Sequence, residues 1–446
     1  MEITSDSEII SRLRGTCSSM CPEKEMIMRE REGLLSPFEV LSTEGDCGTR
    51  KAGRNRPRAD RRKVVKQFSR PAAGRADADP AQLRPAHVLK DTVTYLFTNV
   101  VPQDHPAWSS VYEFVFDRLR AVRQDMVMQG IVGRDAISIL EQVVRFHLFA
   151  SYRLRDAEIS EFDPVINKQH LLECLKRLLY LYKVTPGYHH EREEFEGIYL
   201  LDNLGDPHAL LHCLGLPAQL QTSPLVRQCY KISVAFVLRN YSRALRLMLR
   251  LRSPMCLCAV NPHLYTVRIN YLQILSAGYS VRNCKYPVEK LREQLALTST
   301  ASAIDLCSKC GLIDLFDHPD PNTVGYVSFN KSLFKRPQVE EVKVLPHFNL
   351  IPSYITDAID ASHDSHSRTR EETCNSMVSK CSVIDAAENG SHEMSKPSAA
   401  QFDAVWGLSQ GTPVRSHRGR GVRLTPQGDN TPSTPGRGRG RGRRKV

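Results

Sequence analysis

Residues 116–125 read FDRLRAVRQD, and this charged run lies inside a longer stretch whose apolar residues have helical spacing. Those apolar residues are three or four positions apart, so they share one face of a helix. The other faces are charged, and Asp117 and Arg120 are three residues apart and can pair. The spacing predicts an amphipathic helix with contacts on both sides, although a charged face in solvent is the simplest interpretation of spacing alone. The apolar positions are Val111, Val115, Leu119, Val122 and Met126.

Three further blocks accompany this run. The first, at residues 15–25, reads GTCSSMCPEKE and precedes RERE at 29–32. The second, at residues 65–74, reads VKQFSRPAAG and precedes LRP at 83–85. The last, at residues 141–147, reads EQVVRFH. In this order the four blocks resemble the Sac-three/GANP family over about residues 15–335. The sequence departs from the family pattern at three positions. Leu119 stands where Thr is usual, Ser19 stands where an acidic residue is common, and Pro71 interrupts the block at 65–74. No charged residue of the signature is lost.

The resemblance implies a fold and a class of function. The family's fold is a set of PCI-like helical repeats that ends in a winged helix. A short metazoan branch of the family is associated with centrosome duplication and the mitotic spindle, whereas the larger relatives scaffold the TREX-two complex in mRNA export. We therefore expect a non-enzymatic scaffold in the cytoplasm, at the centrosome and on the spindle, with protein partners that include a PCI-type subunit. The alternative is a nuclear export scaffold that binds RNA.

The signature residues have two interpretations: they hold adjacent helices in register, or they present a surface to a partner. We favour the internal role because Glu141 and Arg145 are four residues apart and the blocks are expected to pack together. The residues concerned are Asp117, Arg118, Arg120, Arg123, Gln124, Asp125, Glu141, Arg145, Phe146 and His147.

The hydrophobic pattern predicts a mostly α-helical chain. Apolar content of 41% in 446 residues is enough for a sizeable core. Asp163-Pro164 and Ser223-Pro224 are typical helix starts, and successive helices with short loops and no strand-like alternation favour an α-solenoid. The expected organisation is a motif segment at 1–32, a basic linker at 33–64, helical repeats at 65–285, a winged helix at 286–350 and a disordered tail at 351–446.

Within the winged-helix segment, we expect a short helix that begins at Pro287 and a second that Thr300 caps and Gly311 ends. A strand should follow near residues 324–329.

The net charge of +12 is concentrated in two segments. Residues 49–70 and 411–446 each carry +9, which leaves −6 for the rest of the chain. Such basic arms suit nucleic acid, acidic protein tails or tubulin-like surfaces, and an import signal or unspecific electrostatics is favoured for the first arm. In the second arm Thr412 and Thr434 fit proline-directed phosphorylation, which would weaken anion binding. The candidate anion or RNA ligands are Arg61, Arg62, Lys63, Arg437, Arg439, Arg441, Arg443 and Arg444.

No pattern of an enzyme or a metal site is visible. The pairs Cys17/Cys21 and Cys307/Cys310 are too far apart in sequence for the usual zinc spacing, so core packing is the favoured interpretation. His189-His190-Glu191 and the pair His363/His366 lack zincin spacing, and no phosphate loop or nucleophile elbow is present. We expect no cofactor. The thirteen cysteines are interpreted as reduced intracellular thiols, and no apolar window is long enough to span a membrane.

Overall fold

The computed structural model describes residues 13–41, 57–70, 79–103, 105–281, 283–312 and 325–337. All of them fall in one compact unit, Met1–Ser367. The second unit, Arg368–Val446, lies outside the described residues. The same is true of the whole predicted tail at 351–446, including its candidate Arg residues, Thr412 and Thr434, and of residues 338–350 of the predicted winged helix.

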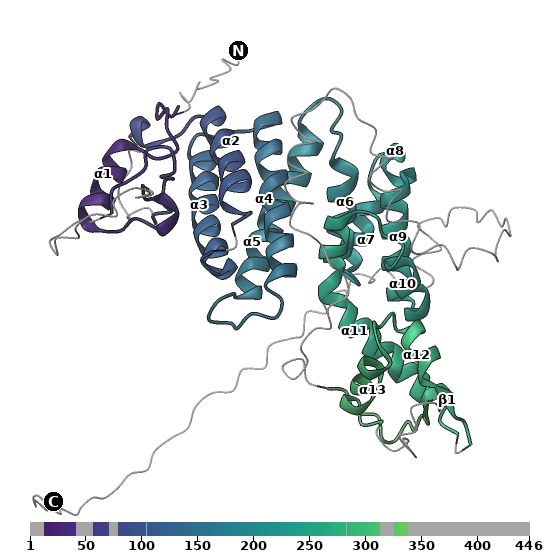
Figure 1. Cartoon of the computed structure of the whole chain (residues 1–446). Helices are drawn as coiled ribbons and strands as arrows, with labels where there is room; N and C mark the ends of the chain where they lie inside the picture. Colours follow the sequence, from purple (N-terminus) through teal and green to yellow (C-terminus); the bar gives the residue numbers. More distant parts are fainter. Residues whose placement is uncertain are drawn as a thin grey trace, which may run out of the picture. The chain divides into compact units, whose positions relative to one another are not determined.

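The described residues are mostly helical, consistent with an α-solenoid (Figure 1). Two strands of two residues each are the only named strands in them.

The N-terminal segment is built around α1, Glu23–Glu32. This helix begins directly after Pro22 and ends at Gly33, whose φ of 72° is the left-handed conformation that favours glycine. A 3-10 turn, η1 (Pro37–Glu39), follows, with Ser36 and Glu39 forming a capping box. An isolated antiparallel bridge joins Val40 to Ala59.

This segment corrects the predicted linker at 33–64, because both of its described ends are packed. Phe38, Glu39 and Val64 are buried. The scarcity of large apolar residues in the segment suggested a linker, but much of its packing is ionic, and hydrophobicity does not reveal ionic contacts.

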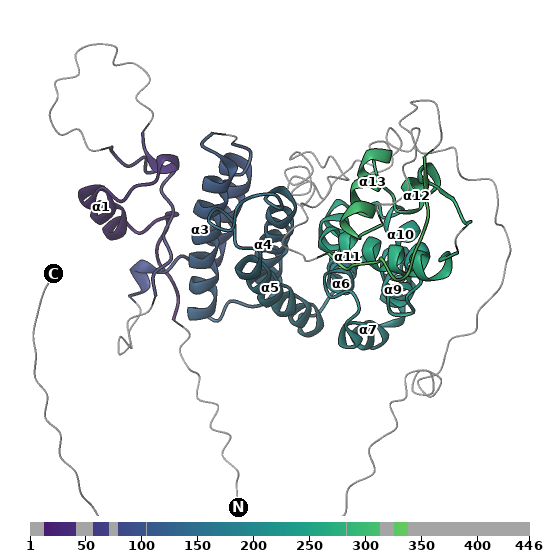
Figure 2. The same cartoon turned by 90° about the horizontal axis from the view of Figure 1, so that it is seen from below.

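The first group of long helices contains the signature. It comprises a 3-10 turn, η2 (Pro80–Gln82), α2 (Ala86–Tyr95), a π-helical turn, η3 (Leu96–Val100), α3 (Trp108–Met128), α4 (Gly133–Arg153) and α5 (Pro164–Val184). Helix α4 packs against α2, α3 and α5, and Figure 2 shows α3, α4 and α5 next to one another, with non-helical parts of the N-terminal segment between α1 and α3. All five predicted apolar positions of α3, from Val111 to Met126, are buried. Asp163 caps α5 by accepting from the backbone N–H groups of Val165 and Ile166, as its sequence predicts.

The second group of helices packs around α6 and α11. Its members are α6 (Arg192–Asp202), α7 (Pro207–Leu214), α8 (Ala218–Thr222), α9 (Pro224–Val237), α10 (Tyr241–Met248) and α11 (Pro254–Gly278). Helix α6 contacts α9 and α11, α10 lies against α9 and α11, and α11 also reaches α4. Ser223 caps α9 as expected.

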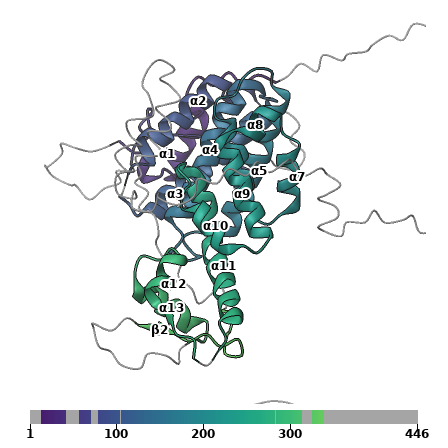
Figure 3. The ribbon, with the colours of Figure 1, turned by 90° about the vertical axis from the view of Figure 1, so that its right-hand side faces the viewer.

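A small module follows α11. Strand β1 (Tyr286–Pro287) pairs antiparallel with β2 (Tyr326–Val327), and between them lie α12 (Val288–Gln294) and α13 (Thr300–Lys309). The predicted order of helix, helix and strand is therefore present. Ser299 caps α13 in place of the predicted Thr300, because its side chain accepts from the Ser302 N–H. Helices α12 and α13 lie beside the C-terminal part of α11 (Figures 1 and 3).

Candidate functional site: a buried charge network on α3

A buried carboxylate, Glu39, joins the N-terminal segment to α3. Its side chain accepts hydrogen bonds from Arg29 at 2.8 and 3.2 Å and from Arg118 of α3 at 3.2 Å. The backbone N–H groups of Ser36 and Val65 donate to the same carboxylate, each at 3.1 Å. Burial lowers the pKa of Arg29, but the charge and hydrogen bonds of Glu39, together with the contribution of Cys21, outweigh this effect, and the pKa lies above its ordinary value. Glu39 is thus a fully buried anion with two cationic partners.

A second buried carboxylate, that of Asp125, lies on α3 two turns beyond Arg118. It accepts from Lys66 Nζ at 2.6 Å and from Arg84 Nε at 2.8 Å. Lys66 also donates to the carbonyl of Gln82, and Arg84 donates to the carbonyl of Met20. Asp125 therefore holds the segments around residues 20, 66 and 84 on one helix. We call the residues around the two carboxylates the charge network: Arg29, Glu39, Lys66, Arg84, Arg118 and Asp125.

The outer signature residues of α3 extend these contacts to residues 68–69 and to α5. Asp117 accepts from the N–H of Phe68 at 3.2 Å and also pairs with Arg118. The Arg120 guanidinium lies 3.8 Å from the centre of the Phe68 ring, a cation–π contact. Gln124 donates to the carbonyl of Ser69 at 2.8 Å. Arg123 faces α5 instead, where it donates to Glu173 at 2.9 Å.

The last signature block lies in α4 and faces α5 and α6. Arg145 is buried and donates to Glu191 at 2.8 Å and to Glu194 at 3.1 Å. Glu141 accepts from the Tyr182 hydroxyl of α5, and burial raises the pKa of the Glu141 carboxyl. Phe146 is buried among the rings of Phe97, Trp108 and Tyr112.

His147 is a fully buried, neutral residue. Its Nδ1 lies 2.7 Å from Asn167 Oδ1, and the Asn167 side chain in turn donates to the His147 carbonyl at 3.0 Å. Burial lowers the pKa of the imidazole to about 3. Since the Tyr112 hydroxyl also donates to Asn167 Oδ1, that oxygen is an acceptor and His147 carries its proton on Nδ1.

Every signature residue thus lies at an internal contact between elements. The sequence pointed to α3 and α4, but it did not single out the partners on the other side. Arg29, Lys66 and Arg84 were within the quoted blocks, whereas Glu39 fell in the predicted linker. The available signal for Glu39 was the capping-box spacing of Ser36 and Glu39, which predicts a helical turn there.

The predicted anion ligands of the first arm have acidic neighbours. Arg61 donates to Glu23 at 2.9 Å, and Lys63 lies 3.6 Å from Asp60, whose side chain also accepts from the Arg62 N–H at 3.0 Å. Both Arg61 and Arg62 are exposed. Arg437, Arg439, Arg441, Arg443 and Arg444 lie outside the described residues.

The cysteines considered as zinc ligands are free thiols inside the fold. Cys17, Cys21, Cys307 and Cys310 are buried, and burial raises the pKa of each of the last three to about 12. In the described ranges no group of three His, Cys, Asp or Glu residues is placed to hold a metal ion. His189 contacts the Thr185 carbonyl, while Glu191 pairs with Arg145. None of the described helices is long and apolar enough to cross a bilayer.

Comparison with known proteins identifies the domain that carries the network. The model of the SAC3/GANP family matches residues 20–314, which include the four signature blocks from Met20 onward. Protein xmas of Drosophila melanogaster is 31% identical over 319 residues, which cover 67% of this chain and 14% of the relative.

Two further relatives bear the family's name. SAC3 family protein 1 of Schizosaccharomyces pombe is 26% identical over 344 residues, covering 72% of this chain and 32% of the relative. SAC3 family protein B of Arabidopsis thaliana is 26% identical over 312 residues, covering 66% of this chain and 17% of the relative. The chain therefore spans less than a third of the length of the curated relatives that it matches.

Proposed function

The chain belongs to the SAC3/GANP family, and from this membership we propose that it is a non-catalytic helical scaffold that organises a protein assembly. The observation that carries the proposal is that the signature charges lie at contacts inside the fold. In the described structure, Arg118 and Asp125 of α3 pair with charged residues of the preceding segments inside the fold. Ionisable groups arranged in this way fix the relative positions of helices, and a scaffold needs such rigidity to present its surfaces.

The C-terminal module is the proposed docking element for a PCI-type subunit, with residues 286–350 acting as a winged helix. Tyr279 and Val281, at the end of α11, are 43% and 62% exposed, and Tyr326 of β2 is 42% exposed. The Tyr279 ring lies 5.3 Å from that of Tyr286, which begins the module. Aromatic residues that remain exposed on a small module are typical of protein interfaces.

Arg268 fixes this module to α11. It is 2% exposed and donates to the carbonyls of Leu295 and Ala296, both at 2.7 Å, where α12 ends. Burial lowers the pKa of Arg268 to about 10. The carbonyls at a helix C-terminus carry partial negative charge and stabilise the buried guanidinium. The module is thus held firmly enough to act as a docking surface.

The docking proposal is tested with purified components. Mixing the full chain with a PCI-type subunit should give a complex of defined stoichiometry in size-exclusion chromatography with light scattering. The double variant Tyr279→Ser/Val281→Ser should weaken the complex at least about tenfold. The matched variant Val127→Ser/Val132→Ser, which changes exposed residues near the ends of α3 and α4, should bind as the unmodified chain does. Equal affinity of both variants would exclude this surface.

We place the assembly at the centrosome and the spindle, the setting implied by the resemblance to the short metazoan branch. A second candidate is the scaffold of a nuclear mRNA export complex with RNA bound to the basic arms. The three matched relatives favour this candidate, because all three are much longer family members. The resemblance implies a role in export for the larger members of the family.

Imaging a tagged copy through the cell cycle separates the two settings. Two perinuclear spots that become spindle poles support the centrosome, whereas steady staining of the nuclear rim supports export. In vitro, the export role requires RNA affinity that falls by about 0.7 log units per log unit of salt for each phosphate contact. Deleting residues 411–446 then tells whether the tail or the folded body binds the RNA.

A further inference from the structure

Helices α9 and α10 lie in a long part of the chain that has no negative charge. From residue 207 to residue 288 the sequence contains ten Lys and Arg residues and no Asp or Glu. Seven of these cations are exposed on or next to α9 and α10, and none of the seven forms an ion pair with a described residue. They are Arg227, Lys231, Arg239, Arg243, Arg246, Arg250 and Arg252.

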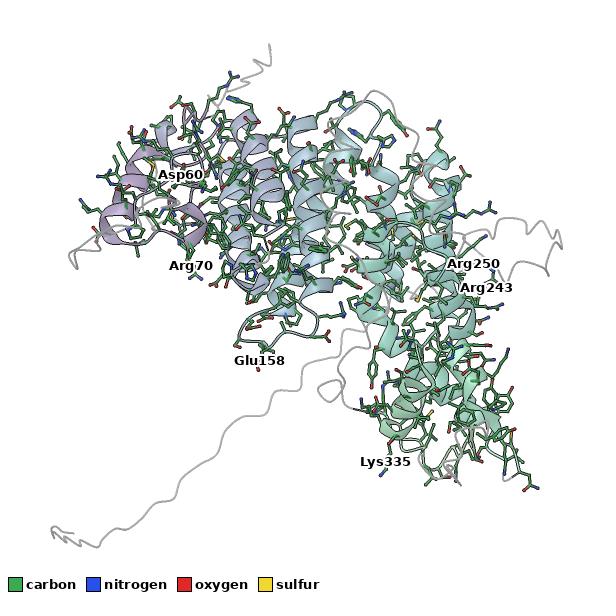
Figure 4. The ribbon with its side chains drawn as sticks, viewed as in Figure 1. Asp60, Arg70, Glu158, Arg243, Arg250 and Lys335 are labelled. Atoms are coloured by element: carbon green, nitrogen blue, oxygen red, sulfur yellow. The ribbon has the colours of Figure 1, made fainter. Side chains whose placement is uncertain are left out.

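Four of them lie on α10 or next to its ends, and we call them the basic ridge: Arg239, Arg243, Arg246 and Arg250. Arg243 and Arg246 are three residues apart and share one side of α10, whereas Arg239 precedes the helix with a φ of 57° and Arg250 follows its end. The opposite side of α10 faces the core through Ala244, Leu245 and Met248. Figure 4 shows the labelled side chains of Arg243 and Arg250 extending away from the helices.

The ridge is not required by the internal packing of the fold. Like charges at neighbouring helical positions repel one another and weaken the helix. The carbonyl groups at the C-terminus of α10 offset this repulsion only for Arg246 and Arg250. Elsewhere in the described chain, the exposed Arg31 and Arg61 each pair with a carboxylate. The unpaired ridge therefore has the electrostatic character of a surface for an anionic partner.

Exposed leucines beside the ridge indicate the kind of anion. Leu238, which precedes Arg239, is 58% exposed, and Leu249, which precedes Arg250, is 48% exposed. Surfaces that bind single-stranded nucleic acid combine cations with aromatic rings for base stacking. Here Tyr241 is buried, and the half-buried Phe236 packs edge-on against it at 5.8 Å. Arginines flanked by exposed aliphatic side chains are instead suited to a protein segment.

We propose that the basic ridge and its two leucines bind an acidic, amphipathic segment of a partner protein. Carboxylates of the segment pair with Arg239, Arg243, Arg246 and Arg250, and its apolar residues contact Leu238 and Leu249. This site extends the proposed scaffold role with a second docking surface, and it does not depend on the C-terminal module.

The test uses the full chain and two labelled probes in fluorescence anisotropy. One probe is a peptide of repeated Leu-Glu-Glu-Leu-Glu-Glu-Glu heptads, and the other is oligouridylate. The ridge variant Arg243→Ser/Arg246→Ser/Arg250→Ser should bind the peptide at least about tenfold more weakly. The control Lys176→Ser/Arg177→Ser/Lys183→Ser removes the same charge from exposed positions of α5 and should change affinity less than about twofold. Since both variants keep the basic arms, the difference between them reports on the ridge.

A second variant separates the two classes of partner. Leu238→Ser/Leu249→Ser keeps every charge, so it should weaken the peptide at least about threefold and leave oligouridylate unchanged. Thermal unfolding confirms that each variant is folded. Equal peptide affinity of the ridge variant and the control would overturn the proposal. A larger loss for oligouridylate than for the peptide would also overturn it, because the ridge would then be a nucleic-acid surface.

Discussion

Glu39 shows why a buried carboxylate with several donors is sensitive to the loss of its charge. It is fully buried, and two guanidinium groups and two backbone N–H groups point to its oxygens. A buried ion pair adds little net stability over apolar residues of similar size, but removal of one partner leaves the other charge buried without compensation. Loss of the Glu39 charge is therefore expected to cost much more stability than the intact ion pairs contribute.

Replacement of Glu39 by Gln should therefore destabilise the fold strongly. Arg29 and Arg118 would keep their charges and lose their shared anion, which costs about 3–5 kcal/mol of unfolding free energy. Urea unfolding followed by circular dichroism measures this loss. The matched change Glu23→Gln removes an exposed partner of Arg61 and should leave the urea midpoint almost unchanged. If the two variants unfolded at the same urea concentration, the charge network would not contribute to stability.

His147 makes stability depend on pH below neutrality. Burial lowers its pKa in the folded state to about 3, whereas the unfolded value is the ordinary 6.5. Below pH 6.5 the unfolded chain therefore binds a proton that the folded chain does not, and stability falls as the pH decreases. At pH 5 this group alone should cost about 2 kcal/mol relative to neutral pH. The effect fades as the pH rises through 6.5, where the unfolded imidazole loses its proton.

Urea midpoints measured between pH 7 and 5 test this dependence. His170 and His263 also have a lowered pKa, so the variant His147→Gln should reduce the acid sensitivity without abolishing it. His190 has an exposed side chain, and His190→Gln should retain the full sensitivity. The interpretation is wrong if both variants lose stability toward pH 5 as steeply as the unmodified chain.

At the scale of the elements, Gly197 controls how closely α6 approaches its neighbours. A Cβ at this position would lie 3.1 Å from Cys229 Sγ of α9 and 3.6 Å from Cys256 Sγ of α11. Glycine is intrinsically poor in a helix, so its presence here is explained by the close contact of three helices. Gly278, at the end of α11, has no atom within 4 Å of a Cβ placed on it.

The two glycines therefore respond in opposite directions to substitution. Gly197→Val should lower the unfolding free energy by about 1–3 kcal/mol through overpacking. Gly278→Ala should be neutral or stabilising by up to about 1 kcal/mol, because alanine is the better helix former and meets no obstacle. Differential scanning calorimetry gives both values. A neutral Gly197→Val variant would mean that α6, α9 and α11 can separate freely.

The sequence identified several helices well, but it did not identify which residues of different elements contact one another. Apolar spacing identified the buried face of α3, and the Asp-Pro and Ser-Pro pairs located the starts of α5 and α9, because periodicity and capping are local properties. The resemblance marked Arg118 and Asp125 as signature residues. It could not show that Glu39 and Arg84 face them, because contacts between distant segments depend on the folded chain. The linker prediction missed the packed residues Phe38, Glu39 and Val64 in the described parts 33–41 and 57–64 for the same reason.

At the scale of the whole molecule, the charge network makes the N-terminal segment part of the helical body. Residues 13–41 and 57–70 reach α3 through Glu39 and Lys66, and Phe38 packs against Phe114 with ring centres 5.0 Å apart. The N–H of Gly15 donates to the Gln129 side chain at 2.8 Å, next to the end of α3. These contacts cover one side of α3 with a segment that has little apolar area of its own.

A chain that begins at Asp79 should therefore be unstable although it retains all the long helices. Arg118 and Asp125 would lose Glu39 and Lys66, and Phe114 would be uncovered. We expect a melting temperature lower by about 10 °C and self-association in size-exclusion chromatography. A peptide of residues 13–70 added in trans should restore both properties, whereas the same peptide with Glu39→Gln and Lys66→Met should not. Rescue by both peptides would assign the effect to apolar covering alone. A truncated chain with normal stability would show that the signature charges of α3 do not need their N-terminal partners.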